Sequence, residues 1–180
     1  MKEENRLKLV PLEIEGSYGI INKQISDGRG SIIRLWEDNS LFTGFSLTEA
    51  SLVTNPVAGT LRGIHYQKKP FDENKIVECV QGRIFDVIVD LRSNSKSATR
   101  KIEIEIGPQC TYQGLVIPKG CAHGYLTMEP QSNLVYFMDN IYSPKNSCGI
   151  VWNDVQIGIN WPSKPVLISE QDLNWPGLNE

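Results

Sequence analysis

The sequence is poor in the side chains that bind first-row metals. It holds two histidines among 180 residues, and its four cysteines, Cys79, Cys110, Cys121 and Cys148, stand far apart without a Cys-x-x-Cys pair. Metal centres usually gather several imidazoles or thiolates, and dithiol redox sites need paired cysteines. We therefore expect no metal and no redox chemistry, and we expect the cysteines to be reduced and mostly structural.

A basic surface and a long apolar run are missing as well. The formal net charge is -3, and no stretch approaches the roughly 20 apolar residues that span a bilayer. The start, MKEENRLKLV, has no apolar signal core. These features disfavour nucleic acid and membranes as partners and predict a cytoplasmic protein. With 40% apolar residues, the chain is expected to fold as one domain over residues 1–180.

No long stretch shows helical periodicity, and short runs rich in Val, Ile and aromatic residues alternate with Gly, Pro and Asn. The chain is therefore expected to be mainly β. Strands are expected near residues 17–22, 30–36, 44–53, 114–117, 124–128, 133–138 and 149–152, and KIEIEI at 101–106 reads as a strand with one buried face.

Residues 76–91, IVECVQGRIFDVIVDL, break at Gln81-Gly82, which suggests a hairpin. In the second half, Asp86 and Asp90 share one face with isoleucines, whereas the other face is wholly apolar. A sheet with one apolar face and one partly polar face suits a layer that packs outward and lines a ligand-binding lumen inward. We predict a cupin-like jelly-roll barrel.

The composition changes after Trp161-Pro162. Ser169, followed by Asp172 three residues later, is typical of a helix N-terminus, and Pro176-Gly177 would end that helix within about two turns. A short C-terminal helical segment is therefore expected.

Both histidines lie in segments with other polar groups. TLRGIHYQ at 60–67 holds Arg62 and His65, and IPKGCAHGY at 117–125 holds His123. Either imidazole alone is more often a packed structural residue than a base. Together with Arg62 and Lys75, however, they would suit a phosphate-bearing or enolate-forming ligand at the mouth of a barrel, unless the two cations are simply solvated strand-end charges.

Several ordered motifs point to a known family. They are DGRG at 27–30, LRGIHYQ at 61–67, KIVECVQGRIFDVIVDLR from Lys75, IPKGCAHGY at 117–125, VYFMDNIYSP at 135–144 and WNDVQIGINWP at 152–162. Over residues 27–172 the chain resembles the dTDP-4-dehydrorhamnose 3,5-epimerases, cupin-fold isomerases of deoxysugar biosynthesis that need no cofactor.

The resemblance implies a role for each matching residue. His65 would be the base, Tyr136 the opposing acid and Asp172 the carboxylate paired with His65. The substrate-binding residues would be Arg29 at the diphosphate, Lys75 near the enolate oxygen, and Arg62, Asp86 and His123 in the lumen. It also implies a nucleotide-sugar substrate and a homodimer that exchanges terminal strands.

Each assignment has a structural rival. Tyr136 lies in the apolar run LVYFM and could be a core residue with its hydroxyl bonded at the edge. Asp172 could cap its helix, Lys75 could be solvated, and Asp86 could pair with an arginine.

The substrate-binding surround departs from the family pattern. Arg34 and Ser147 stand where glutamates are common, Gln171 stands where a lysine is common, and Ser31 and Ile32 replace phenylalanines. In the segment SLTEASLVTNPVAG, neither the glutamine nor the asparagine that the family has before LRG is evident at a matching position, and the register of this loop is loose. The catalytic centre is better kept than the substrate-binding residues around it, which suggests the same enolate chemistry on a modified substrate or at a single carbon.

The function expected from these residues is epimerisation of a dTDP-4-keto-6-deoxyhexose in rhamnose or O-antigen biosynthesis. A single-site epimerase, inverting carbon 3 or carbon 5 alone, is the main alternative, and a non-catalytic sugar-binding barrel is another. Tyr136 and Asp172 speak against a 3,4-ketoisomerase. A metal-dependent cupin oxygenase would need a His-x-His cluster, whereas Tyr66 and Gln67 follow His65.

Overall fold

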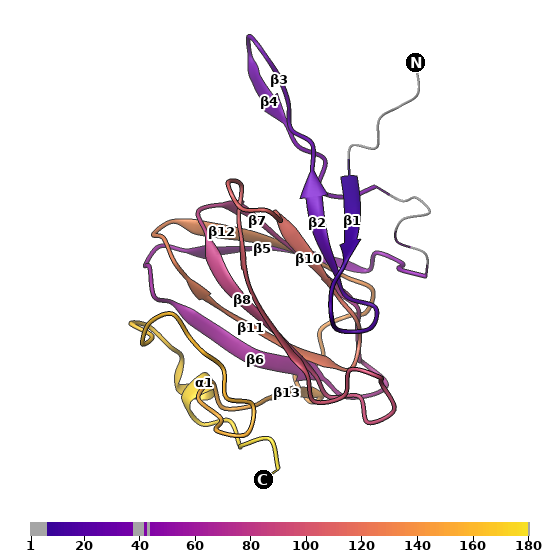
Figure 1. Cartoon of the computed structure of the whole chain (residues 1–180), viewed down its shortest axis with the longest axis vertical. Helices are drawn as coiled ribbons and strands as arrows, with labels where there is room; N and C mark the ends of the chain where they lie inside the picture. Colours follow the sequence, from indigo (N-terminus) through magenta and orange to yellow (C-terminus); the bar gives the residue numbers. More distant parts are fainter. Residues whose placement is uncertain (1–6, 38–41, 43, 180) are drawn as a thin grey trace.

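Two antiparallel sheets face each other in a computed structural model, which describes residues 7–37, 42 and 44–179. Figure 1 shows the two layers with a space between them, and the C-terminal segment lies beside the lower layer. This is the predicted jelly roll, with a short C-terminal helix, and it confirms the expected fold class. Within the described residues, no helix is long and apolar enough to cross a membrane.

The strands divide into three sheets. The six-stranded sheet runs in the order β1 (Leu7–Pro11), β2 (Tyr18–Asn22), β10 (Gly114–Ile117), β7 (Lys75–Gln81), β12 (Ser132–Met138) and β5 (Glu49–Asn55). The five-stranded sheet runs in the order β13 (Ser147–Gly149), β6 (Leu61–Gln67), β11 (Cys121–Thr127), β8 (Ile84–Asp90) and β9 (Lys101–Ile106). A separate hairpin joins β3 (Ile25–Asp27) and β4 (Gly30–Ile32).

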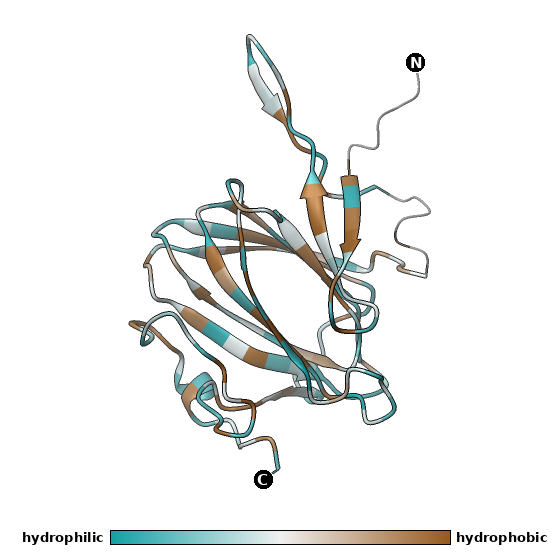
Figure 2. Ribbon diagram, in the orientation of Figure 1, coloured by the Kyte–Doolittle hydropathy of each residue, from teal (hydrophilic) through white to brown (hydrophobic). Residues whose placement is uncertain are grey.

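The core between the sheets follows from strand alternation. Val77 of β7 and Ile88 of β8 belong to the same buried cluster in the lumen. Ile76, one residue before Val77, belongs instead to a cluster on the outer face of the six-stranded sheet. Successive side chains point to opposite faces, so each strand serves two clusters. Figure 2 shows the resulting alternation of hydrophilic and hydrophobic residues along the strands.

The outer face of the five-stranded sheet is covered by the chain's own C-terminal segment. Val87 and Val89 of β8 pack there with Ile150, and Trp161 and Leu178 join them from beyond the last strand. The apolar face expected for β8 is therefore confirmed. This packing carries the segment that holds helix α1 (Glu170–Leu173) to the edge of β6.

The hairpin expected within residues 76–91 is wrong. β7 belongs to the six-stranded sheet and β8 to the five-stranded sheet, so the turn carries the chain from one layer to the other. Gly82 has a φ of 75°, and a Cβ there would lie 2.4 Å from Oγ of Ser132. The chain does turn at Gln81-Gly82 as predicted, but periodicity within two strands does not say whether the strands pair with each other.

Several strand boundaries also differ from expectation, among them that of the strand expected at 124–128, which begins at Cys121. The strand expected at 30–36 ends at Ile32, the one expected at 44–53 begins at Glu49, and the one expected at 149–152 is Ser147–Gly149. After β4 the chain becomes irregular because Trp36 packs on the outer face of the six-stranded sheet, with its ring 6.1 Å from that of Phe137. Tertiary packing there overrides the local β pattern.

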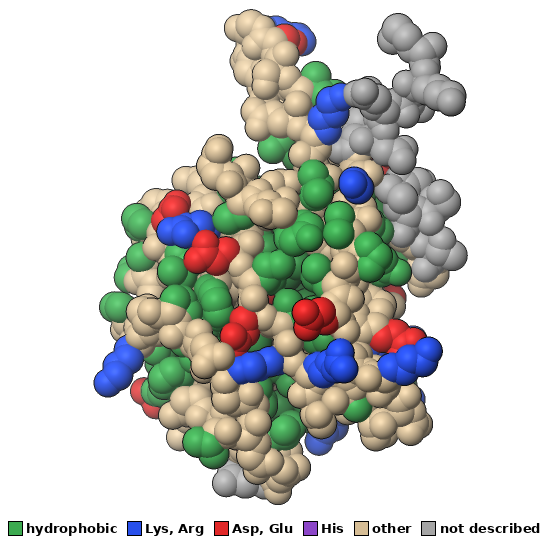
Figure 3. Space-filling model, in the orientation of Figure 1, with side chains coloured by type: hydrophobic (Ala, Val, Ile, Leu, Met, Phe, Trp, Pro, Cys, Tyr) green, Lys and Arg blue, Asp and Glu red, His purple; other side chains and the backbone are tan. Residues whose placement is uncertain are grey.

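The β3–β4 hairpin stands clear of the rest of the molecule, as Figure 3 shows. All residues of both strands are exposed, including Ile32, whose exposed fraction is 71%. At the tip, the Arg29 guanidinium pairs with Asp27 at 2.7 Å. An arm that exposes isoleucine is a candidate for contact with another molecule.

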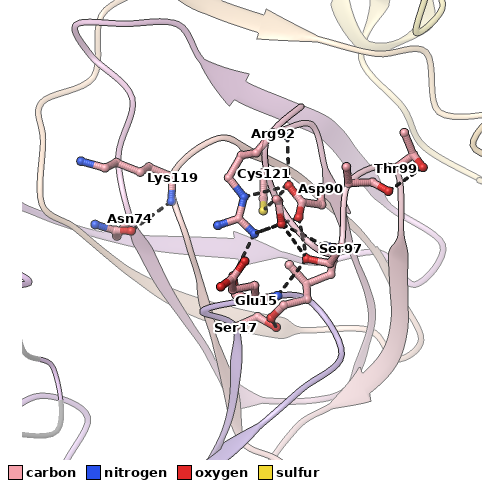
Figure 4. Close-up of polar contacts among 12 residues, drawn as sticks. Glu15, Ser17, Asn74, Asp90, Arg92, Ser97, Thr99, Lys119 and Cys121 are labelled. Atoms are coloured by element: carbon pink, nitrogen blue, oxygen red, sulfur yellow. Dashed lines mark hydrogen bonds and ion pairs between the residues drawn. The ribbon is translucent and has the colours of Figure 1, made fainter.

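A buried ion pair closes one end of the sandwich (Figure 4). The Asp90 side chain is fully buried and receives two hydrogen bonds of 2.8 Å from Arg92 and one of 2.7 Å from Ser97. Burial alone would raise the pKa of Asp90, but these hydrogen bonds outweigh it and hold the pKa below its usual range. Arg92 also donates to the Glu15 carbonyl, which ties this loop to the N-terminal region.

Replacing Asp90 with asparagine is expected to lower the free energy of unfolding by about 3 kcal/mol at pH 7, because it leaves Arg92 without its buried partner. The pKa of Asp90 is lower in the folded state, so its stabilisation is present above the unfolded-state pKa of about 4 and is lost as the pH falls below that value. Urea unfolding at pH 7 and pH 3 measures both effects. Glu105→Gln, which breaks an exposed pair with Arg83, is the control and should cost less than about 1 kcal/mol. Equal losses in the two variants would contradict the prediction.

Glu78 is a second buried carboxyl group, on the outer face of the six-stranded sheet. It is 1% exposed, its Oε2 receives a hydrogen bond of 2.5 Å from Asn22, and its Oε1 has no hydrogen-bond partner among the described residues. Burial raises the pKa of Glu78 to about 8, against the smaller opposing effect of the Asn22 hydrogen bond. The carboxyl group is therefore largely protonated at neutral pH.

Glu78→Gln is expected to remove a loss of stability at alkaline pH. Because the folded-state pKa is raised, the contribution of Glu78 is full below its unfolded pKa and is lost as the pH rises through about 8. Between pH 6 and pH 9 the unmodified chain should lose about 2 kcal/mol relative to Glu78→Gln in denaturant titrations. Parallel pH profiles for the two proteins would count against this.

Candidate active site

A cavity of 580 Å³ opens between the two sheets, and a second one of 260 Å³ adjoins it. His65, Lys75, Tyr136 and Gln171 line both, so the two form lobes of one site. The larger lobe is also lined by Arg62, His123 and Asp172. The structure thus brings six of the residues predicted from the sequence to one cavity. Asp86, which was also predicted, does not line the cavity and lies behind His123.

His65 and Asp172 form a hydrogen-bonded pair. Nε2 of His65 lies 2.5 Å from Oδ1 of Asp172. The His65 side chain is 38% exposed toward the cavity, whereas that of Asp172 is 6% exposed. The imidazole therefore presents its free edge to a ligand while a buried carboxylate holds its other side. A carboxylate in this place fixes the tautomer of the ring and stabilises its protonated form.

The C-terminal helix positions the carboxylate. Ser169 caps the helix by accepting a hydrogen bond of 3.1 Å from the Asp172 backbone N–H, as its sequence position predicts. The Asp172 side chain does not cap the helix; it turns to β6, where it accepts the Gly63 backbone N–H at 3.3 Å. Trp175 donates its indole N–H to Oδ1 at 3.2 Å.

These contacts keep Asp172 ionised. Burial raises its pKa, but the hydrogen bond and charge of His65, together with the Gly63 and Trp175 donors, outweigh it and lower the pKa of Asp172. The carboxylate is therefore negative at neutral pH, as a partner for an imidazolium must be.

Tyr136 approaches the cavity from the opposite layer. It lies on β12 of the six-stranded sheet, whereas His65 lies on β6 of the five-stranded sheet (Figure 1). Burial, followed by the nearby Tyr125 and Asp86, raises the pKa of Tyr136 well above its ordinary value. Its hydroxyl is thus protonated in the free site and able to donate.

Lys75 and Arg62 bring positive charge to the lumen. Nζ of Lys75 lies 2.8 Å from Oε1 of Glu73, whose other oxygen accepts a hydrogen bond from Gln67. Nε of Arg62 donates to Oδ1 of Asn55 at 3.0 Å. Both cations line the larger lobe, so neither is merely a solvated strand end.

His123 is supported from behind by Asp86. Its Nε2 lies 2.8 Å from Oδ2 of Asp86, which is fully buried on β8. The sequence left open whether Asp86 pairs with an arginine, and its partner is this histidine instead. Oδ1 of Asp86 has no hydrogen-bond partner among the described residues. His123 thus faces the cavity with its ring orientation fixed by a carboxylate.

Arg29 and the altered residues beside it lie outside the cavity. Arg29 is at the tip of the hairpin, and Arg34 pairs on the surface with Glu37 at 3.1 Å. Ser31 and Ile32 belong to the exposed strand β4. In contrast, the altered positions Ser147 and Gln171 line the smaller lobe.

Strand β5, which lies in the segment before LRG, supplies side chains to both lobes. Glu49 and Ser51 line the smaller lobe, Val53 lines the larger lobe, and Leu52 points outward with 66% of its surface exposed. Glu49 accepts the backbone N–H of Tyr142 at 3.1 Å. Strand β5 therefore contributes the carboxylate of Glu49 to the smaller lobe.

The assembled groups suit proton transfer on two faces of one ligand. A carboxylate-paired imidazole lies on one side, a protonated phenol lies on the other, and an ammonium group lies between the sheets. Within the described part of the chain, no three His, Cys, Asp or Glu side chains cluster so as to hold a metal ion. The arrangement is typical of general acid–base chemistry beside an electron-withdrawing group.

Comparison with known proteins gives the family. The sequence model of dTDP-4-dehydrorhamnose 3,5-epimerase matches residues 11–180. The chain belongs to the dTDP-4-dehydrorhamnose 3,5-epimerase family. Its relative from Methanothermobacter thermautotrophicus is 32% identical, and the alignment covers 96% of this chain and 95% of that protein.

Two further epimerases of the family are similar to the chain. The enzyme of Shigella flexneri is 39% identical over 116 residues, and this match spans 64% of each protein. The crystal structure of the Bacillus anthracis enzyme, solved with TDP and PPi bound, is 30% identical and superposes with a TM-score of 0.89 over 96% of this chain and 99% of that one. The epimerase fold predicted from the sequence motifs is confirmed along nearly the whole chain.

Several residues of this epimerase-family site were missed by the sequence reasoning. They are Asn55 beside Arg62, Glu73 beside Lys75, Tyr125 beside Tyr136, and Trp175 beside Asp172. Strand alternation could have found Tyr125, since it lies two residues after His123 on the same strand. No sequence signal marks Trp175, because only the docking of the C-terminal segment brings it to the His65–Asp172 pair.

Proposed function

We propose that the chain inverts carbon 3 and carbon 5 of dTDP-4-keto-6-deoxyglucose, the step that its family performs in rhamnose biosynthesis. One observation carries the proposal: His65 and Tyr136 come from opposing sheets and line the same two lobes. Inversion requires a base on one face of the sugar and an acid on the other. A site built for binding alone has no need of that arrangement.

His65 takes the proton from the carbon next to the ketone, and the electron pair moves into an enolate. Asp172 holds the resulting imidazolium, with its 2.5 Å contact already in place. The Lys75 ammonium is the cation nearest to stabilise the enolate oxygen, with Glu73 holding its chain in place. Tyr136 then gives its proton to the carbon from the other face, which inverts that centre.

Arg62 and His123 are proposed to hold the substrate in the larger lobe, and Asp86 fixes His123. Arg62 also suits a phosphate, because a guanidinium binds anionic oxygens in pairs. The substitutions at Ser147 and Gln171 lie in the smaller lobe, together with Glu49. We propose that this lobe adapts the chain to its particular nucleotide sugar.

A homodimer is proposed from the exposed hairpin. Ile25 and Ile32 are 45% and 71% exposed on an arm whose two strands are exposed throughout in the described part of the chain, and a second copy would cover them. Arg29 at the tip could then reach a diphosphate in the partner's cavity. Light scattering should give twice the chain mass, and Ile32→Glu should reduce the measured mass; a monomeric protein at micromolar concentration would refute the dimer.

A cytoplasmic location stays a prediction.

The test of the activity is hydrogen exchange. The protein is incubated with dTDP-4-keto-6-deoxyglucose in deuterated water, and NMR follows deuterium at carbon 3 and carbon 5. Exchange with inversion at both carbons is expected. Exchange at one carbon alone would establish the single-site epimerase suggested by the altered lobe, and absence of exchange at either would refute the proposed activity on this substrate.

A further inference from the structure

A second tyrosine lies directly behind the proposed acid. Tyr125 of β11 is 1% exposed, and its hydroxyl donates to Oδ1 of Asn55 at 3.2 Å. Tyr125 and Tyr136 line the same lobe, Tyr136 packs against the core cluster that contains Tyr125, and an interaction between the two hydroxyls contributes to the pKa of each. Since the single proton of Tyr125 goes to Asn55, its oxygen is left to accept a hydrogen bond from Tyr136 in the free site.

Asn55 is held in place by two other contacts. Its Nδ2 donates to the Ser132 carbonyl at 3.0 Å, and its Oδ1 accepts Nε of Arg62 at 3.0 Å. Tyr125, Asn55 and Arg62 therefore form a chain of hydrogen bonds that leads from the neighbour of the proposed acid to a cation. Asn55 keeps one donor at Oδ1 even if the Tyr125 hydroxyl turns away.

The surroundings of Tyr136 oppose formation of its phenolate. Burial is the main cause of its raised pKa; Tyr125, in the orientation it has in the free site, and the fully buried Asp86 carboxylate add to it, whereas Arg62 acts in the other direction. His65, Lys75 and His123 are the other titratable groups lining this lobe, with Asp172 beyond His65. A phenol that must release a proton here needs a donor aimed at its oxygen.

We propose that Tyr125 is a positioning residue for this reaction, whose hydroxyl turns from Asn55 to donate a hydrogen bond to Tyr136 as Tyr136 gives up its proton. The inference rests on the proposed epimerase function. The balance is simple: the enolate electron pair forms the new C–H bond with the Tyr136 proton, and the Tyr136 oxygen keeps the O–H pair. Tyr125 keeps its own proton throughout. After each inversion, solvent returns a proton to Tyr136 and takes one from His65, so that both groups are reset before the next carbon is inverted.

This role sets the fate of the enolate. Each enolate either accepts a proton from Tyr136 and inverts, or takes one back from His65 and keeps its configuration. Without the Tyr125 donor the first route slows, while proton removal by His65 on the opposite sheet does not. Because the His65 side chain is 38% exposed, its imidazolium exchanges with solvent, and the returned atom in deuterated water is a deuterium.

The experiment compares the unmodified chain with Tyr125→Phe, which removes one oxygen atom and keeps the ring. With dTDP-4-keto-6-deoxyglucose in deuterated water, NMR counts inverted product and recovered substrate that carries deuterium. We expect inversion to fall about ten- to a hundredfold, the sum of exchange and inversion to change less than about threefold, and exchange without inversion to rise accordingly. Tyr112→Phe, another tyrosine packed against the same core, is the matched control and should leave the ratio unchanged.

A double-mutant cycle distinguishes the proposed role of Tyr125 from a folding defect. Once Tyr136→Phe has removed the acid, adding Tyr125→Phe should lower inversion no further. An equal loss of exchange and inversion in Tyr125→Phe, an unchanged ratio, or additive losses in the double variant would each overturn the proposal. If the unmodified chain shows no exchange at all, the epimerase function fails first, which is a distinct result.

Discussion

Turnover is expected to fall about a thousandfold when His65 is replaced by asparagine, because the change removes the Asp172-paired imidazole that is proposed to take the proton. Asparagine is smaller than histidine and loses the Nε2 contact with Asp172, but it stays polar and uncharged, so binding of the nucleotide sugar should change less than about threefold. Deuterium exchange and calorimetric titration on the same preparation measure the two quantities.

The control for His65→Asn is His123→Asn, which removes the other imidazole of the site. His123 is held by Asp86 and is proposed to bind substrate, so its loss should raise KM more than it lowers the exchange rate. If His65→Asn retained full exchange, the base would be another residue. If the unmodified chain bound the sugar with no turnover at all, the sugar-binding barrel would be the better description.

Tyr136→Phe is the second change with a large expected effect. Inversion should fall about a thousandfold, since phenylalanine cannot donate a proton, yet exchange through His65 should continue on the other face. The recovered sugar would then carry deuterium with its configuration unchanged. NMR coupling constants distinguish the epimers, and mass spectrometry counts the deuterium.

The result that would contradict this assignment is a joint loss of exchange and inversion in Tyr136→Phe. Such a loss would mean that the hydroxyl is needed for substrate binding or for the cavity itself. Phe137, the next residue on β12, lies on the outer face and offers a control. Phe137→Leu should alter stability while leaving the ratio of exchange to inversion as it is.

The sequence predicts the His65–Asp172 pair and Tyr136 better than it predicts the residues around them. Ser169 and Asp172 predict the helix start, and the family motifs select His65 and Tyr136, because these signals are local in the chain. Nothing local shows that β7 and β8 lie in different sheets, and so the expected hairpin was wrong. Pairing is decided by which apolar faces meet, and that information is spread over the whole sequence.

The substrate-binding side was harder to predict for the same reason. Glu49 and Ser51 could not be assigned from the segment before LRG, since the register of β5 follows from its pairing with β12. Arg29 matches a family motif, yet its place on a free-standing hairpin means that its role depends on a second molecule. The residues that can be predicted from sequence alone are those that lie in short local motifs, even where, as for His65 and Asp172, their partners are far away in the chain.

Asp172 lies on helix α1, beyond the last strand. The C-terminal segment that carries this helix packs on the outer face of the five-stranded sheet, and Asp172 reaches from there to His65 of β6. The two sheets come earlier in the chain, so during synthesis the pocket emerges from the ribosome before its carboxylate does. A newly made sandwich therefore holds an imidazole without its partner. The His65–Asp172 pair therefore forms only after the C-terminal segment has docked. Because residues between 167 and 172 also line the larger lobe, removal of this segment would open the pocket as well as take away the carboxylate.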